Sequence, residues 1–367
     1  MTKDELIAVL RLQNIPHIGD VTAKKLITHC GSPIAVFTDK MRHLEKIEGI
    51  GRVTIRGLQN RKYLLAAEKE YEFIMSNNIS YSYFKDGDYP KYLKHCIDAP
   101  ILLFKKGNMQ LENRKIISIV GTRNSTSYGR AFCEEFIENV APLDPVIISG
   151  FAYGIDICAQ RAALKNGLQT VACVAHGLNQ IYPRAHLKYV DEICNNGGFL
   201  TEFWSTSNPD RENFLKRNRI IAGISEATIV IESAEKGGSL VTADMANNYN
   251  RDVFAVPGRV KDKYSLGCNN LIKGQKAHML TSAADLIYLM NWQLEESNTA
   301  PVQKQLFVEL DDNEKIIYSF LQKDGRQLLD QIALECHLPV FKAVSSLLNM
   351  EMKGMIRPLP GKQYEAI

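Results

Sequence analysis

The 367-residue chain lacks several patterns that define common protein classes. Its eight cysteines are scattered and include no C-x-x-C pair, which excludes the usual spacing of a zinc site and a disulfide framework. There is no run of about 18 apolar residues, and the N-terminal residues are acidic where a signal peptide carries positive charge. These absences predict a cytoplasmic protein with no metal and no membrane partner.

Signatures of nucleotide enzymes are absent as well. Neither G-x-G-x-x-G nor the P-loop G-x-x-x-x-G-K-[ST] occurs, and Gly49 and Gly51 do not restore the first because they lie between predicted helices. Without paired carboxylates, a metal cluster or an activated nucleophile, we predict no catalytic residue, no cofactor and no enzymatic activity. The net charge of +3 is compatible with a polyanionic partner but does not require one.

The middle of the chain, about residues 105–292, alternates strand-like and helix-like stretches. Continuously apolar strands are predicted at 116–120, 146–149, 170–174, 199–201, 227–231 and 252–256. Such strands, separated by helices, are typical of a doubly wound, mostly parallel sheet that is buried on both faces. We therefore predict a Rossmann-like α/β domain whose ligands bind beyond the carboxyl ends of the strands.

A helical domain is predicted at residues 1–75, followed by a connecting segment at 76–104. Its two glycine-containing breaks, around Gly19 and Gly49, resemble a helix-hairpin-helix (SAM-like) pair, in which backbone N–H groups approach a phosphate. His17 replaces a glycine of the motif in the first hairpin. Residues 40–62 contain seven Lys/Arg and two Glu, a local charge of +5. This basic face either contacts DNA or is simply solvated.

Residues 293–310 are a predicted linker, and 311–367 a predicted winged helix. This domain has seven Lys/Arg and eight Asp/Glu, a net charge of −1, whereas a helix that enters a DNA groove needs a basic surface. Its candidate recognition helix, 339–352, has one cation, Lys342, and most of its apolar residues are expected in the domain's own core. We predict that the domain binds protein, with Arg357 and Lys362 as possible phosphate contacts.

Most strands of the central domain end in a turn of small and polar residues. The first turn contains Gly121 and Arg123, and the second contains Gly150 and Asp156, a residue expected to hold its loop rather than act as a base. Glycines let backbone N–H groups approach an anion, and arginine adds a fixed positive fork. Several such turns at one sheet edge predict a site for several phosphates in a row.

The order and spacing of these turns resemble the DNA-processing protein A (DprA/Smf) family. The matching motifs are Gly121-Thr-Arg123, Ser149-Gly-Phe-Ala-Tyr-Gly-Ile-Asp156, Tyr182-Pro183, Phe214-x-x-Arg217-Asn218-Arg219, Gly238-Ser-Leu-Val-Thr242 and Val256-Pro-Gly258. One departure is Ala175-His176-Gly177, where the family usually has Gly-x-Gly. The resemblance implies a protein that binds single-stranded DNA without cutting it and loads RecA onto it during natural transformation. The DNA contacts are expected at Gly121, Arg123, Ser125, Gly150, Arg184, Arg211, Phe214, Arg217, Asn218, Arg219, Gly238 and Ser239.

The resemblance also implies a homodimer through the end of the central domain, around Asn269, Leu271, Ile272 and Met279. The competing interpretation is that Leu271 and Ile272 are ordinary core residues. For the function, the alternative is a Rossmann-like enzyme or sensor that binds or hydrolyses nucleotides. Its diagnostic Pro-Gly-Gly-x-Gly-Thr turn is missing where the chain has Glu235-Lys-Gly-Gly-Ser, so DNA binding is favoured.

Overall fold

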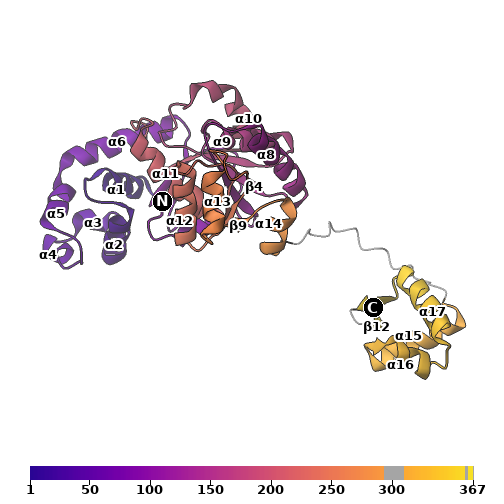
Figure 1. Cartoon of the computed structure of the whole chain (residues 1–367). Coiled ribbons are helices and arrows are strands. Elements are labelled where there is room, and N and C mark those ends of the chain that lie inside the picture. Colours follow the sequence, from indigo (N-terminus) through magenta and orange to yellow (C-terminus); the bar gives the residue numbers. More distant parts are fainter. Residues whose placement is uncertain (293–309, 360–362, 367) are drawn as a thin grey trace. The chain divides into compact units, whose positions relative to one another are not determined.

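The computed structural model describes residues 1–292, 310–359 and 363–366. The chain divides into two compact units, Met1–Leu294 and Glu295–Ile367 (Figure 1). Nearly all of the predicted linker, as well as Lys362 of the wing, lies outside the described residues. Within those residues, no helix is long and apolar enough to cross a membrane.

The first unit is built on a sheet that has nine strands in the described part of the chain, in the order β1-β2-β6-β5-β4-β3-β7-β8-β9. The strands are β1 (Ser80–Tyr83), β2 (Leu102–Gly107), β3 (Ile116–Val120), β4 (Val146–Ser149), β5 (Thr170–Cys173), β6 (Gly197–Thr201), β7 (Ala227–Val230), β8 (Asp252–Ala255) and β9 (His278–Met279). The seven neighbouring strands from β6 to β9 in this order pair in parallel, whereas β2 pairs antiparallel with both β1 and β6. The predicted mostly parallel α/β sheet is confirmed.

The segment 76–104, expected to be a connection, contributes to this sheet. It contains all of β1 and the start of β2, and β1 forms one edge of the sheet. β1 has the sequence Ser-Tyr-Ser-Tyr, and only its last two residues are buried. Because an edge strand is covered incompletely, it lacks the continuous apolar character that reveals the inner strands.

Helices cover both faces of the sheet. One face carries α7 (Lys91–Lys94), α11 (Arg211–Ile224), α12 (Gly238–Asn248) and α13 (Leu266–Lys273). The opposite face carries α8 (Ser127–Val140), α9 (Ile155–Lys165) and α14 (Ala283–Leu289). The connections also include α10 (Val190–Asn195) and two short 3-10 helices, η1 (Ala141–Leu143) and η2 (Arg184–Tyr189). With both faces covered, the turns at the strand ends are the part of the sheet that a ligand reaches.

Six helices of the described chain precede the sheet. They are α1 (Lys3–Asn14), α2 (Asp20–Cys30), α3 (Ala35–Thr38), α4 (Met41–Leu44), α5 (Arg52–Gln59) and α6 (Arg61–Ser76). Their apolar side chains share one core with Leu102 and Phe104 of β2, so the two predicted domains form one compact unit. In the hairpins, His17 and Gly49 both have a positive φ, +66° and +84°. His17 therefore takes a backbone conformation that favours glycine.

The second unit has the topology of a winged helix, which confirms the prediction. Its elements are α15 (Asp312–Asp324), β10 (Gln327–Leu328), α16 (Leu329–Glu335), α17 (Val340–Met352), β11 (Ile356–Leu359) and β12 (Gln363–Ala366). The strands pair antiparallel in the order β10-β12-β11. The buried core includes Ile317, Leu321 and Ile332 together with Leu347 and Met350 of α17.

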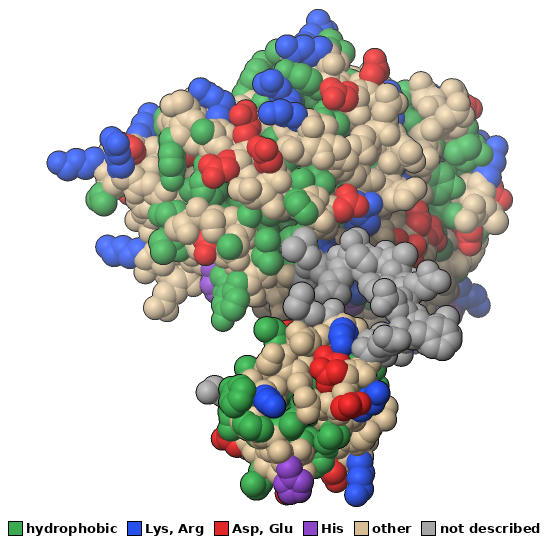
Figure 2. All heavy atoms as spheres, turned by 90° about the vertical axis from the view of Figure 1, so that its right-hand side faces the viewer, with side chains coloured by type: hydrophobic (Ala, Val, Ile, Leu, Met, Phe, Trp, Pro, Cys, Tyr) green, Lys and Arg blue, Asp and Glu red, His purple; other side chains and the backbone are tan. Residues whose placement is uncertain are grey.

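Helix α17 departs from its prediction, because most of its apolar residues do not enter this core. Phe341 is 72% exposed and Leu348 56%, and Val340 and Val344 are exposed as well. The buried face of α17 is made of Ala343, Ser346, Leu347 and Met350, whereas the four exposed apolar residues point to solvent. Hydrophobic side chains accordingly lie on the surface of this unit (Figure 2).

Candidate nucleic-acid interface

The strand order of the sheet reverses at β3. From β3 the chain continues to β4, β5 and β6 on one side and then returns to place β7, β8 and β9 on the other. Such a reversal opens a crevice outside the carboxyl ends of the strands, because the connections that follow the two neighbouring strands, β3 and β7, lead away from each other. The turns after β3 and β7, together with α11 and α12, line a pocket of about 770 Å³ at this point.

The pocket brings together eight of the twelve residues predicted to contact DNA. These are Gly121, Arg123, Arg211, Phe214, Arg217, Asn218, Gly238 and Ser239. Gly150 lines a small hollow that shares Arg123 and Phe214 with the pocket. Ser125 and Arg184 line neither; Arg184 is exposed at the start of η2, and the carbonyl of Ser125 accepts a hydrogen bond from Arg130 (2.6 Å).

The turn after β3 is held in place by Glu232, which follows β7. The backbone N–H of Thr126 donates to the buried Glu232 carboxylate (2.9 Å), as does its hydroxyl (2.5 Å), and the N–H of Thr122 donates to the carbonyl of Glu232 (2.7 Å). Gly154 also has to be glycine, because its φ is +81° and a Cβ would lie 2.1 Å from the carbonyl oxygen of Thr122. The turn is thus fixed while Arg123, at its tip, is exposed.

Arg217 joins the ends of two strands beneath the pocket. Its guanidinium is almost completely buried and donates to the carbonyl oxygens of Gly150 (2.8 Å) and Cys173. Asp156 accepts a hydrogen bond from the N–H of Gly150 (3.1 Å), the loop-holding contact expected for it. Burial raises the pKa of the Asp156 carboxyl, and the positive charge of Arg217 opposes that shift. A Cβ at Gly150 would collide with both side chains.

Exposed cations and aromatic rings surround the mouth of the pocket. The guanidinium carbon of Arg123 lies 5.0 Å from the ring centroid of Phe214, and the ring of Tyr182 lies 5.9 Å from the same centroid. Tyr182 and Tyr153 are 42% and 47% exposed, and Lys236 lines the pocket on the other side. Rings beside cations can hold bases and phosphates of the same strand.

Sequence reasoning did not single out Tyr153, Tyr182 and Lys236, although each lies within a quoted motif or turn. Tyr182 directly precedes Pro183, and Lys236 belongs to the glycine-rich turn after β7. Glu232 carried no such signal, because its partner Thr126 is 106 residues away in the chain.

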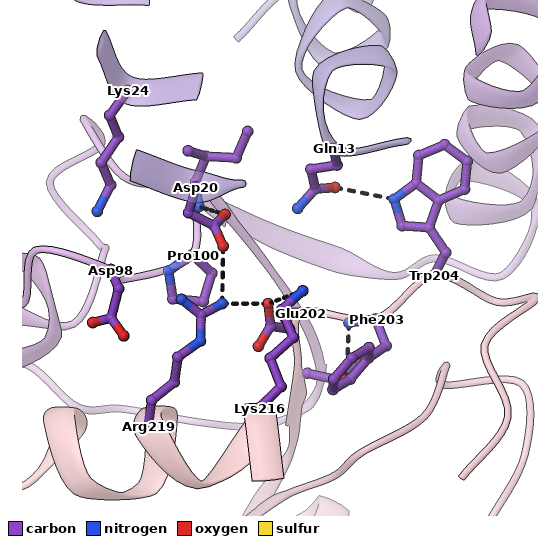
Figure 3. A network of polar contacts seen from close by, with 12 residues as sticks. Gln13, Asp20, Lys24, Asp98, Pro100, Glu202, Phe203, Trp204, Lys216 and Arg219 are labelled. Atoms are coloured by element: carbon purple, nitrogen blue, oxygen red, sulfur yellow. Dashed lines mark hydrogen bonds and ion pairs between the residues drawn. The ribbon is translucent and has the colours of Figure 1, made fainter. Parts of the chain in front are cut away.

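Arg219, which was also predicted as a DNA contact, lies outside the pocket. Its guanidinium is buried and forms ion pairs with Asp20 at the start of α2 (2.9 Å) and with Glu202, which follows β6 (Figure 3). These carboxylates raise the pKa of Arg219 above its ordinary value. The other oxygen of Asp20 accepts the N–H of Ile101 (2.9 Å), so the N-terminal helices are tied to both the sheet and α11.

The residues predicted at a dimer interface differ in their surroundings. Leu271 is buried in the core, as its competing interpretation stated, and Ile272 packs partly against the same core. The side chain of Asn269 exchanges two hydrogen bonds with the backbone of Gly258 (3.0 and 3.1 Å). Met279 is 54% exposed on β9, the edge strand of the sheet.

Comparison with known proteins decides the family. The family model of DNA recombination-mediator protein A matches residues 80–291, and that of the DprA winged helix domain matches residues 302–362. The chain belongs to the DprA/Smf family. DNA processing protein DprA of Streptococcus pneumoniae is 40% identical over 202 residues, which cover 55% of this chain and 71% of the relative. Protein Smf of Escherichia coli is 33% identical over 276 residues, 74% of each chain.

Solved DprA structures share this architecture. The crystal structure of DprA from Streptococcus pneumoniae is 29% identical and has a TM-score of 0.63; the match covers 78% of this chain and 98% of that one. The structure of DprA from Helicobacter pylori, which gave insight into its single-stranded DNA binding mode, is also 29% identical and has a TM-score of 0.52. That match covers 58% of this chain and 96% of the other.

Proposed function

We propose that this DprA/Smf protein binds single-stranded DNA across the pocket at β3 and β7 without cleaving it, and loads RecA onto that DNA during natural transformation. The observation that carries the DNA proposal is the set of exposed cations, Arg123, Arg211 and Lys236, around one pocket that Phe214 also lines. RecA loading is supported by family membership.

The form of the pocket favours a single strand over a duplex. Exposed rings at Tyr153 and Tyr182 offer stacking surfaces that only unpaired bases can use, because a duplex keeps its bases stacked inside. A flexible sugar-phosphate backbone can also follow a row of turns, whereas the described turns present no helix to a major groove. We therefore expect affinity to fall with salt, with a slope near −0.7 for each neutralised phosphate.

The nucleotide-enzyme alternative finds less support at this site. The volume suits a nucleotide, but the two buried carboxylates beside the pocket, Asp156 and Glu232, are both occupied in holding loops. The hydroxyl next to Glu232, that of Thr126, also accepts the N–H of Gly129 (3.2 Å) as the N-cap of α8, so it serves the turn as well. This arrangement supports a role in binding without catalysis.

The test is fluorescence anisotropy with a labelled oligonucleotide and its matched duplex, alongside an assay for turnover of nucleoside triphosphates. We expect tighter binding of the single strand and no turnover. A duplex of matched length that binds as tightly as the single strand and loses that affinity in an Arg123→Ala variant contradicts the proposal. Turnover that is lost in the same variant establishes the alternative. RecA loading is tested by filament assembly on DNA coated with a single-strand-binding protein, where no acceleration rejects it.

We further propose that the chain forms a homodimer through the edge strand β9. Ile272 and Met279 line one shallow groove beside this strand, and a sheet edge with exposed apolar side chains is suited to a self-complementary contact. Replacing Met279 with Glu is expected to give monomers in light scattering, while the control Val260→Glu, at a still more exposed apolar position, leaves the dimer intact. A dimer that survives Ile272→Glu and Met279→Glu together rules this surface out.

A further inference from the structure

The N-terminal helices carry a second basic surface, which lies apart from the pocket. It comprises α4, the hairpin that contains Gly49 and Gly51, α5 and the start of α6, residues 40–62, and is called here the hairpin surface. In Figure 1, α4 and α5 lie at the end of the first unit that is farthest from β9. Seven exposed cations belong to it: Lys40, Arg42, Lys46, Arg52, Arg56, Arg61 and Lys62. Among the described residues none of their side chains forms an ion pair.

The positions of these cations oppose the stability of their own helices. Arg52 is the first residue of α5, and Arg61 and Lys62 open α6, where the positive end of the helix dipole favours acidic residues; neither first turn has one. Arg52 and Arg56 are also four residues apart, so like charges face each other along α5. Helix α1 shows the ordinary pattern, with Asp4 and Glu5 in its first turn. A bound polyanion would convert this repulsion into attraction.

The backbone of the hairpin is open to the same ligand. Gly51 is the N-cap of α5 and supplies no side-chain cap, so the first N–H groups of the helix have no side-chain acceptor. A Cβ added at Gly49 or Gly51 would meet nothing within 4 Å, which shows that the space in front of the hairpin is empty of protein. Phosphate oxygens can therefore approach these N–H groups, and the exposed Arg52 and Arg56 of the same helix add positive charge.

Few acidic groups weaken this surface. Glu45 and Glu48 are its own carboxylates, and the neighbouring Asp39 is bound to His43 (Nδ1–Oδ1 2.9 Å) and to the N–H of Lys40 (2.7 Å). The hairpin surface also contains no Phe, Tyr or Trp, in contrast to the pocket. Without rings it offers no stacking platform for unpaired bases, but fixed cations on rigid helices suit the regularly spaced phosphates of a duplex.

We propose that the hairpin surface is a second DNA site, which binds the phosphate backbone of duplex DNA irrespective of sequence. The protein would then hold a duplex and a single strand at the same time, on two different parts of one compact unit. The family model begins at residue 80, beyond this surface. The proposal does not depend on the pocket binding single-stranded DNA.

The experiment measures binding of a labelled 30-base-pair duplex to the full chain by fluorescence anisotropy, with excess unlabelled oligo-dT present to occupy the pocket. The double variant R52E/R56E is compared with K106E/K165E, which changes the net charge equally at exposed positions of β2 and α9. We expect at least a tenfold loss of duplex affinity for R52E/R56E and less than a threefold change for the control. The slope of log K against log salt is expected to become shallower by about 1.8, for two lost phosphate contacts.

A second variant, R52Q/R56Q, distinguishes the loss of a DNA contact from misfolding of α5. Since it removes repulsion within α5, its melting temperature is expected to equal or exceed that of the wild type while its duplex affinity still falls. Equal losses in R52E/R56E and the control overturn the proposal, as does unchanged duplex affinity in R52Q/R56Q or a wild type that fails to bind the duplex. Binding to vesicles of anionic lipid without binding to the duplex overturns it too, and assigns the surface to a membrane. Oligo-dT affinity within threefold of wild type in both Arg52/Arg56 variants separates this site from the pocket.

Discussion

Arg211 and Arg219 lie on the same helix, α11, and their surroundings are opposite. Arg211 is exposed at the start of the helix and lines the pocket, whereas Arg219 is buried between Asp20 and Glu202. Arg217 adds a third case, a buried guanidinium that donates to backbone carbonyls under the pocket. Arg217 and Arg219 point to different neighbours because residues two apart project about 200° from each other round a helix.

This comparison shows that the same residue type serves binding where solvent reaches it and cross-links the fold where solvent does not. A buried ion pair adds little net stability when it forms, because desolvation offsets the attraction, but removing one partner leaves an uncompensated charge. Removing an exposed arginine leaves no buried carboxylate without its counter-charge. Stability and DNA affinity should therefore respond to different arginines, and each prediction below tests that separation.

The largest effect is expected for Arg219→Met. This change leaves Glu202 and Asp20 without their common cation, and we expect the free energy of unfolding to fall by about 3–5 kcal/mol. Urea unfolding followed by tryptophan fluorescence measures it, because Trp204 and Trp292 both belong to the first unit. Arg211→Met is the matched control and should leave the unfolding curve unchanged. Equal destabilisation by both variants breaks the comparison.

The complementary prediction concerns Arg123→Ala, at the exposed tip of the turn after β3. We expect affinity for single-stranded DNA to fall about tenfold for all sequences alike, since a phosphate contact carries no base information. The unfolding curve should match that of the wild type. Lys165→Ala, at an exposed position on α9, is the control and should change neither quantity. An affinity loss confined to particular sequences would assign Arg123 to a base instead.

Acid should act on the buried groups around Arg217. His176 is buried, and burial together with the charge of Arg217 lowers its pKa. The unfolded chain then binds more protons below pH 6.5, so stability is full above that pH and is lost as the pH falls through it. Between pH 7 and 5.5 we therefore expect this residue to lower the free energy of unfolding.

A His176→Gln variant isolates that contribution, measured as the change in unfolding free energy between the two pH values rather than as stability itself. Its pH dependence should be shallower than that of the wild type. The slope that remains includes His186, whose pKa is also lowered by burial and whose ring bonds the carbonyl of Phe151 (3.0 Å). An identical slope in both proteins would show that His176 is protonated to the same extent in the folded and unfolded chain.

The smallest effect is expected from removing the winged helix, since α17 has neither kind of arginine. Deleting the residues after about Asp311 should leave the affinity for single-stranded DNA within a factor of about three, less than 1 kcal/mol. A tenfold loss in a truncated protein that is still folded and dimeric would show that the net charge of this unit misjudged its role. Since Phe341 and Leu348 are exposed, we expect the deletion to abolish any protein contact made through α17.

The sequence was sufficient for the elements whose signal is local. Continuous apolar runs identified six of the seven inner strands, all but β2, and glycine-rich turns identified the edge at which Gly121 and Gly238 meet. The spacing of apolar residues also identified the helix pair of the winged helix. β1 was not predicted, because an edge strand with the sequence Ser-Tyr-Ser-Tyr has no apolar run.

The prediction that most apolar side chains of α17 are buried was wrong. The spacing of the apolar residues of α17 correctly predicted a helix. It did not predict which of these side chains are buried, because more of them could face a core than actually do. Only the packing of α15 and α16 against Ala343, Leu347 and Met350 makes that choice.

What the sequence determined by itself was most of the inner strands, the glycine-rich turns that follow them, the helix pair of the winged helix and the family, since each depends on residues close together in the chain. Tertiary structure alone decided which arginines reach solvent. Arg219 is paired with Asp20, 199 residues away, and the turn of Arg123 is fixed by Glu232, 106 residues from Thr126. Charge is a property of a residue, but burial and pairing depend on neighbours that only folding brings together.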